Sequence, residues 1–92
     1  MHPPIELLKS THTFPETYIF KVIGTSDEGF LGRVLASARE AAGLQTDPEF
    51  SVRQTTGGRH VSVTLALPME SAERVVEVYK SLAKVEGLTL LL

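Results

Sequence analysis

One stretch of the sequence carries glycines at a polar hinge, whose backbone N–H groups could bind a small anion. It is KVIGTSDEGFLGRV, residues 21–34, where an apolar segment passes through a polar hinge into a helical pattern. Free backbone N–H groups at a helix N-terminus attract phosphates and carboxylates. We therefore nominate the N–H groups of Gly29 and Phe30 as a candidate binding site for a small carboxylate. The glycine spacing matches neither GxGxxG nor the Walker pattern, so the sequence does not indicate a nucleotide site.

The hinge also has a purely structural interpretation, in which its own side chains satisfy these N–H groups. Thr25 and Glu28 have the spacing of a capping box, and the Asp27 carboxylate can accept from the N–H groups that follow it. Asp27 and Glu28 would also repel an incoming carboxylate. We therefore expect the hinge to be mainly structural, with a weak latent anion site.

Other patterns that could support catalysis are weak. The close acidic pairs are typical of helix starts and solvated helix faces, and they are Asp27–Glu28, Glu70–Glu73 and Glu73–Glu77. The three histidines lack the spacing of metal ligands, no cysteine is present, and no GxSxG elbow occurs. The sequence therefore predicts that the protein is not an enzyme and holds no metal or cofactor.

The order of elements predicts an α+β fold. Strand patterns occur at residues 17–24, 49–55, 59–67 and 88–92, and helical patterns at 30–42 and about 70–85. This βαββαβ order predicts a ferredoxin-like sandwich, with an antiparallel four-stranded sheet in the order 4-1-3-2 and two helices on one face. Residues 1–16 are interpreted as an N-terminal lead-in with one helical turn at residues 5–8, and residues 17–92 as a single ferredoxin-like, ACT-like domain.

Alternation along the strands predicts which side chains are buried. Seven residues are expected in one core: Phe20, Val22, Val34, Val63, Leu65, Val76 and Tyr79. The helices are expected to leave the other face of the sheet open, with Lys21, Arg53 and His60 as a small basic patch. The two central strands place no aromatic side chain there, and the formal net charge is −2, so we predict no nucleic-acid binding.

Three segments carry a resemblance to a known family: FPETYIFKVIG, VRQTTGGRHVSVTLAL and SAERVVEVYKSLAKVEGLTLLL. From about Phe14 onward, the chain resembles the YbeD-like family of small bacterial proteins of unproven function. The glycine-containing turn before HVSVTL is the most specific part, and Tyr79 also fits. The resemblance implies a ferredoxin-like fold akin to ACT regulatory domains and a proposed association with lipoate metabolism.

The hinge also resembles the effector loop of ACT domains, where a strand leads into Asp-x-Pro-Gly-x-Leu-x-x-Val. Asp27, Gly29, Leu31 and Val34 match this pattern, whereas Glu28 stands in place of the proline. In ACT domains the loop binds an amino acid at a dimer interface, so the resemblance implies that Asp27, Gly29 and Phe30 contact such a ligand.

Two functional hypotheses follow from these features. The first is a non-enzymatic regulatory or adaptor domain that binds an unknown protein partner. The second is an ACT-like sensor of an amino acid or other small carboxylate. We expect a homodimer, because the core is small and Ile19, Ile23 and Leu91 lack cover. No apolar run approaches the ~20 residues of a membrane span and the chain lacks cysteine, so the prediction is a cytoplasmic protein with no membrane contact.

Overall fold

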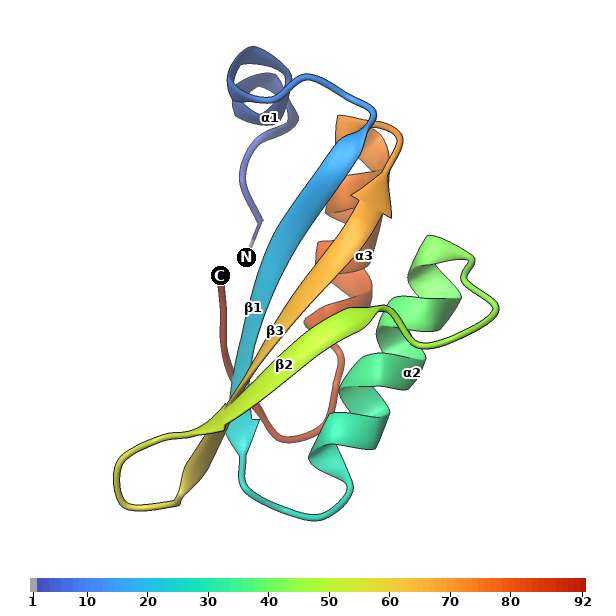
Figure 1. The fold of residues 1–92 in the computed structure, drawn as a ribbon. Helices are drawn as coiled ribbons and strands as arrows, with labels where there is room; N and C mark the ends of the chain where they lie inside the picture. Colours follow the sequence, from blue (N-terminus) through green and yellow to red (C-terminus); the bar gives the residue numbers. More distant parts are fainter. Residues whose placement is uncertain (1) are drawn as a thin grey trace.

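The computed structural model describes residues 2–92, which form three helices and four strands (Figure 1). In chain order these are α1 (Ile5–Thr11), β1 (Glu16–Thr25), α2 (Phe30–Ala42), β2 (Glu49–Gln54), β3 (His60–Met69), α3 (Ala72–Leu82) and β4 (Leu88–Leu91). The predicted α+β class is confirmed, and α1 is an additional helix before the βαββαβ core.

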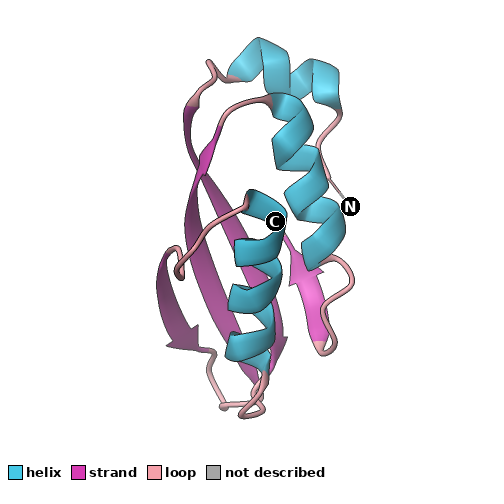
Figure 2. Cartoon of the chain, turned by 90° about the vertical axis from the view of Figure 1, so that its right-hand side faces the viewer, coloured by secondary structure: helices cyan, strands magenta, loops and turns pink. Residues whose placement is uncertain are grey.

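The four strands form one antiparallel sheet in the order β2-β3-β1-β4. The predicted order 4-1-3-2 names the same neighbours, counted from the β4 edge. Helices α2 and α3 lie on one side of the sheet, as the rotated view shows (Figure 2). The other side carries no helix, and we call it the open face.

The core lies between the sheet and the two long helices. All seven residues expected in it are buried, with at most 6% of each side chain exposed. In β1 the buried residues alternate with exposed ones, and direct pairs such as Phe20–Leu65 and Val22–Val63 place both partners toward the helices. Burial of an aliphatic or aromatic side chain contributes about 1.5–3 kcal/mol, so this layer provides much of the stability of so short a chain.

The N-terminal segment packs more tightly than the predicted single turn implies. It forms the seven-residue helix α1, which contacts α3, and its Leu8 is 1% exposed. An ion pair between Lys9 and Glu73, with 2.9 Å between Nζ and Oε2, joins the two helices on the surface. Residues 5–11 therefore complete the core of the domain that follows them.

Both expected ends of the last helix and one expected face were wrong. Helix α3 begins at Ala72, because the Ser71 hydroxyl caps it by accepting from the Arg74 N–H at 3.1 Å, and it ends at Leu82. In β4, Leu91 is buried at 6% exposure. The β1–β4 register shifts between Ile23 and Gly24, so Leu91 faces the core.

Candidate functional site

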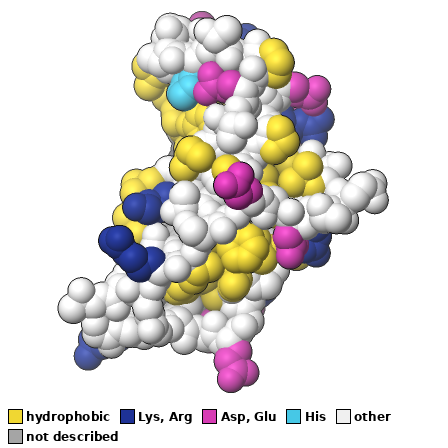
Figure 3. All heavy atoms as spheres, viewed as in Figure 1, with side chains coloured by type: hydrophobic (Ala, Val, Ile, Leu, Met, Phe, Trp, Pro, Cys, Tyr) yellow, Lys and Arg dark blue, Asp and Glu magenta, His cyan; other side chains and the backbone are white. Residues whose placement is uncertain are grey.

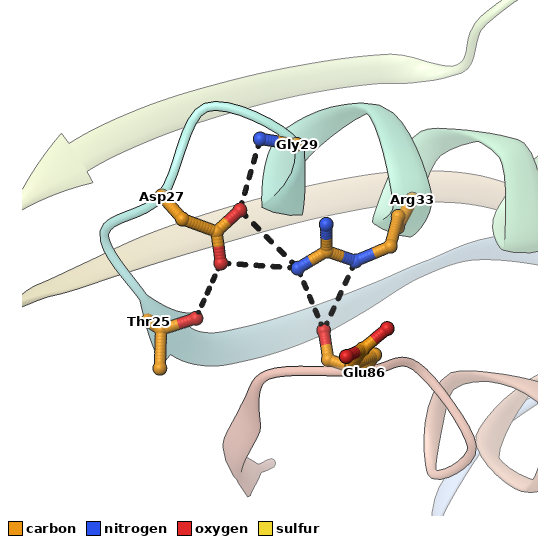
Figure 4. Close-up of polar contacts among 5 residues, drawn as sticks. All are labelled: Thr25, Asp27, Gly29, Arg33 and Glu86. Atoms are coloured by element: carbon orange, nitrogen blue, oxygen red, sulfur yellow. Dashed lines mark hydrogen bonds and ion pairs between the residues drawn. The ribbon is translucent and has the colours of Figure 1, made fainter.

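The Asp27 carboxylate organises the hinge between β1 and α2 (Figure 4). It accepts from the Thr25 hydroxyl at 2.8 Å, from the Gly29 N–H at 2.9 Å, and from Arg33 Nη2 at 3.1 and 3.3 Å. The Thr25 hydroxyl and the Arg33 guanidinium both lower the pKa of Asp27 below its ordinary value. The carboxylate is thus ionised at neutral pH and its charge is balanced by Arg33.

Arg33 also fixes the hinge to a distant part of the chain. Its Nε and Nη2 donate to the Glu86 carbonyl oxygen at 3.1 and 3.0 Å, just before β4. A Cβ atom at position 29 would lie 2.5 Å from Arg33 Nη1, so Gly29 leaves space for this side chain. Sequence reasoning missed Arg33. Its only local signal is its place six residues after Asp27 in the first turn of a helix.

The two N–H groups that were nominated for a ligand carboxylate have acceptors within the chain. Gly29 donates to the Asp27 side chain, and Phe30 donates to the Asp27 carbonyl oxygen at 3.3 Å. The expected capping box is wrong, because Gly29 is the N-cap of α2, no side chain caps this helix, and Thr25 bonds Asp27. A ligand carboxylate would therefore have to displace Asp27 from its partners.

The side chain of Phe30 is a core residue of the hinge. It is fully buried, and its ring lies against Gly24 at the end of β1. A Cβ atom at position 24 would lie 2.7 Å from the Gly87 carbonyl oxygen and closer still to the Phe30 ring. The Thr25 N–H donates to that same carbonyl at 3.0 Å. Gly24 thus allows β1, α2 and the turn before β4 to meet.

The open face places two of the three expected basic residues together. Lys21 and Arg53 line one shallow cavity of about 350 Å³, with Ile23 and Ser62. His60 lies farther along β3, opposite Thr25, and does not line this cavity. Among residues 2–92, neither Lys21 nor Arg53 takes part in an ion pair.

Apolar side chains lie beside these cations on the open face. Ile19, Leu90 and Leu92 are between 45 and 56% exposed. Leu90 pairs with Ile23, and Leu92 exchanges backbone hydrogen bonds with Lys21, so both leucines share the face of these β1 residues. Sequence reasoning identified Ile19 and Ile23 but missed the two leucines, because the shifted register of β4 decides which of its residues face outward. The space-filling view shows exposed hydrophobic atoms next to basic and acidic groups (Figure 3).

Comparison with protein families places the chain in a known group. A family model described as "Protein of unknown function (DUF493)" matches residues 9–92. The chain belongs to the DUF493 family. A UPF0250 protein of Shewanella frigidimarina is 36% identical over 74 residues, which are 80% of this chain and 82% of that protein. A UPF0250 protein of Shewanella amazonensis is 32% identical over the same shares. These relatives confirm the resemblance to YbeD-like proteins.

Solved structures similar to this DUF493 protein have the ACT-like form of the ferredoxin fold. The solution structure of protein HP0495 from H. pylori matches with a TM-score of 0.63 and 16% identity, over 100% of this chain and 97% of that one. The crystal structure of the ACT domain from a GTP pyrophosphokinase of Chlorobium tepidum matches with a TM-score of 0.59 and 10% identity, over 84% and 97%. At these identities the likeness concerns the fold.

Residues 2–92 of the DUF493 protein lack two further kinds of feature. This part of the chain contains no group of three or more histidine, aspartate and glutamate side chains that could hold a metal ion. No helix in it has the length and apolar character needed to cross a bilayer.

Proposed function

We propose that this DUF493 protein is a non-enzymatic regulatory or adaptor domain that acts by binding another protein through its open face. The observation that supports this most directly is the exposure of Ile19, Leu90 and Leu92 on the side of the sheet opposite α2 and α3. Grouped apolar side chains in contact with water mark interaction surfaces, because their burial by a partner releases hydrating water.

The charges on the open face indicate which chemical groups a complementary partner would carry. Among the side chains that the strands direct to the open face, Lys21 and Arg53 are cationic and Glu49 is acidic, a formal side-chain charge of +1. The side chains of the whole chain sum to −2. A partner with an apolar patch flanked by acidic groups complements this surface. Such charge complementarity raises the association rate and fixes orientation more than it adds affinity.

A pair of matched variants tests this proposal. Ile19→Ser and Leu92→Ser together remove apolar area from the open face, whereas Leu7→Ser removes a side chain of similar exposure, 51%, from α1. Proteins crosslinked to each variant in cells are identified by mass spectrometry. We expect partners that the Leu7→Ser variant retains and the open-face variant loses. Identical sets of crosslinked proteins from both variants would contradict the proposal.

The second candidate function is an ACT-like sensor of an amino acid or other small carboxylate. Its support is Arg33, whose side chain is 36% exposed and stands at the hinge where a ligand carboxylate could compete with Asp27. Titration with pooled amino acids and short carboxylates, followed by NMR, separates the two functions. Saturable shifts confined to residues 25–31 at sub-millimolar concentration would favour the sensor, and unchanged spectra would favour the adaptor.

A further inference from the structure

Strand β2 forms one edge of the sheet, and it is exposed along its whole length. All six of its residues are exposed, including Phe50 at 41% and Val52 at 44%. Its inner side pairs with β3, and no other described strand pairs with its outer side. In Figure 1, β2 lies in front of β3 and β1, and no helix or loop passes in front of it. Such an edge presents a row of free backbone donors and acceptors to another chain.

The register with β3 decides which backbone groups of β2 are free. The Thr55 N–H donates to the His60 carbonyl at 3.0 Å, so this pair is a hydrogen-bonded one. Hydrogen-bonded and non-bonded pairs alternate in an antiparallel ladder. It follows that residues 49, 51 and 53 bond to β3, and that residues 50, 52 and 54 direct their N–H and C=O groups outward.

We propose that β2 pairs with β2 of a second copy of this chain, antiparallel, about a two-fold axis at Ser51. In this register Phe50 lies opposite Val52 of the second copy, and the two exchange backbone hydrogen bonds through their outward groups. Glu49 lies opposite Arg53 of the second copy as a non-bonded pair, in which side chains approach most closely. The two-fold axis repeats each pairing, as a symmetric dimer requires.

Charge and apolar complementarity select this register over its neighbours. Only shifts of two residues keep the outward groups facing each other. A shift one way places Phe50 opposite itself and Arg53 opposite Asp47, which already pairs with Arg39. It also moves Pro48, which has no N–H to donate, from the end of the ladder opposite Gln54 to a position opposite Val52. A shift the other way places Phe50 opposite Gln54 and leaves Arg53 opposite Ser51. Only the axis at Ser51 gives two opposite-charge pairs and two apolar pairs, and Glu49 and Arg53 form no ion pair within residues 2–92.

The paired strands would form one continuous sheet of eight strands. Residues directly opposite each other in a sheet point to the same face, so the open faces of both copies lie on one side and the helices on the other. The dimer is independent of the function proposed for the open face, because Ile19, Leu90 and Leu92 lie on and beside β1 and stay uncovered.

Charge reversal at the two paired positions tests the dimer in the full chain. Glu49→Arg and Arg53→Glu each place like charges opposite each other twice, so each variant alone should dimerise about tenfold more weakly than the natural protein. An equimolar mixture of the two variants restores opposite charges at every pair. We expect sedimentation velocity to detect a heterodimer in the mixture at concentrations where each variant alone is monomeric.

Control variants make the same charge changes away from β2. Glu40→Arg on α2 and Arg59→Glu in the β2–β3 turn are exposed and should leave dimerisation unchanged. Amide hydrogen exchange gives a second readout, because Phe50 and Val52 should become protected as the protein concentration rises, whereas Ser51 and Arg53 are protected throughout. A natural protein that stays monomeric at high micromolar concentration would overturn the proposal. So would a dimer whose affinity neither single reversal changes.

Discussion

Replacing Gly24 by alanine tests the packing that holds the hinge. The added Cβ would lie 2.7 Å from the Gly87 carbonyl oxygen and closer still to the Phe30 ring, which is fully buried and cannot move into solvent. Overpacking of this kind costs about 1–3 kcal/mol, and we expect the upper end because one obstacle is backbone. That is a large share of the roughly 5–14 kcal/mol expected for a chain of this length.

Thermal and urea unfolding measure the effect. A loss of about 3 kcal/mol corresponds to a fall of about 12–24 °C in the melting temperature of a domain of this size. The matched control is Gly32→Ala, because a Cβ there meets no atom within 4 Å and the position lies within α2. That variant should gain about 0.5–1 kcal/mol from the higher helix propensity of alanine.

A double-mutant cycle locates the strain. Phe30→Leu shortens the obstructing side chain, so Gly24→Ala combined with Phe30→Leu should lose less stability than the sum of the single losses. The rescue should be partial, because the Gly87 carbonyl remains in place. Equal melting temperatures for Gly24→Ala and Gly32→Ala would refute this packing of Gly24 against Phe30 and Gly87, as would simple additivity in the cycle.

Three further predictions concern stability and its dependence on pH. The buried hydroxyls of Tyr18 and Tyr79 lie 3.1 Å apart. Tyr79→Phe should cost about 1–3 kcal/mol in urea unfolding, because it leaves the Tyr18 hydroxyl without this partner. Changing both tyrosines to phenylalanine should cost less than the two single changes summed. The folded protein lowers the pKa of Asp27, so the ionised carboxylate stabilises the fold above its ordinary pKa of 3.8, and this stabilisation is lost as the pH falls through the folded-state pKa. Asp27→Asn should flatten this acid-side dependence of the free energy of unfolding. An unchanged pH profile would contradict the prediction. Leu65→Ala should lower the free energy of unfolding by about 2–5 kcal/mol, because Leu65 is fully buried. Ile19→Ala on the open face should change it by less than about 0.5 kcal/mol. Similar losses at both positions would mean that the core face and the open face of the sheet are wrongly assigned.

Short-range patterns were sufficient to predict the faces of β1 and β3 and the bounds of one helix. The alternation in β1 and β3 correctly identified the buried side chains, because one face of each strand meets helices and the other does not. The bounds of α2 match the predicted 30–42, since Gly43 ends it in the left-handed conformation with φ of 67°. These features depend on neighbours within a few residues, which the sequence displays directly.

The missed features depend on contacts between distant parts of the chain. Arg33 reaches the Glu86 carbonyl across 53 positions, and no local pattern indicates that pairing. The outward faces of Leu90 and Leu92 depend on the register shift between Ile23 and Gly24. Thr25 and Glu28 had the spacing of a capping box, yet the Thr25 hydroxyl bonds Asp27, because that carboxylate is held in reach by Arg33.

The groups that remain available for binding lie on the sheet rather than at the hinge. At the hinge, the Gly29 and Phe30 N–H groups and the Asp27 carboxylate already have partners. On the sheet, β2 has an unpaired edge and the open face has exposed apolar side chains. Edge pairing would present two copies of the open face on one side of a single sheet, so a two-fold symmetric partner would engage both. Glu49→Arg should therefore lower the ratio of the affinity for a dimeric partner to the affinity for a monomeric partner, because it removes this avidity.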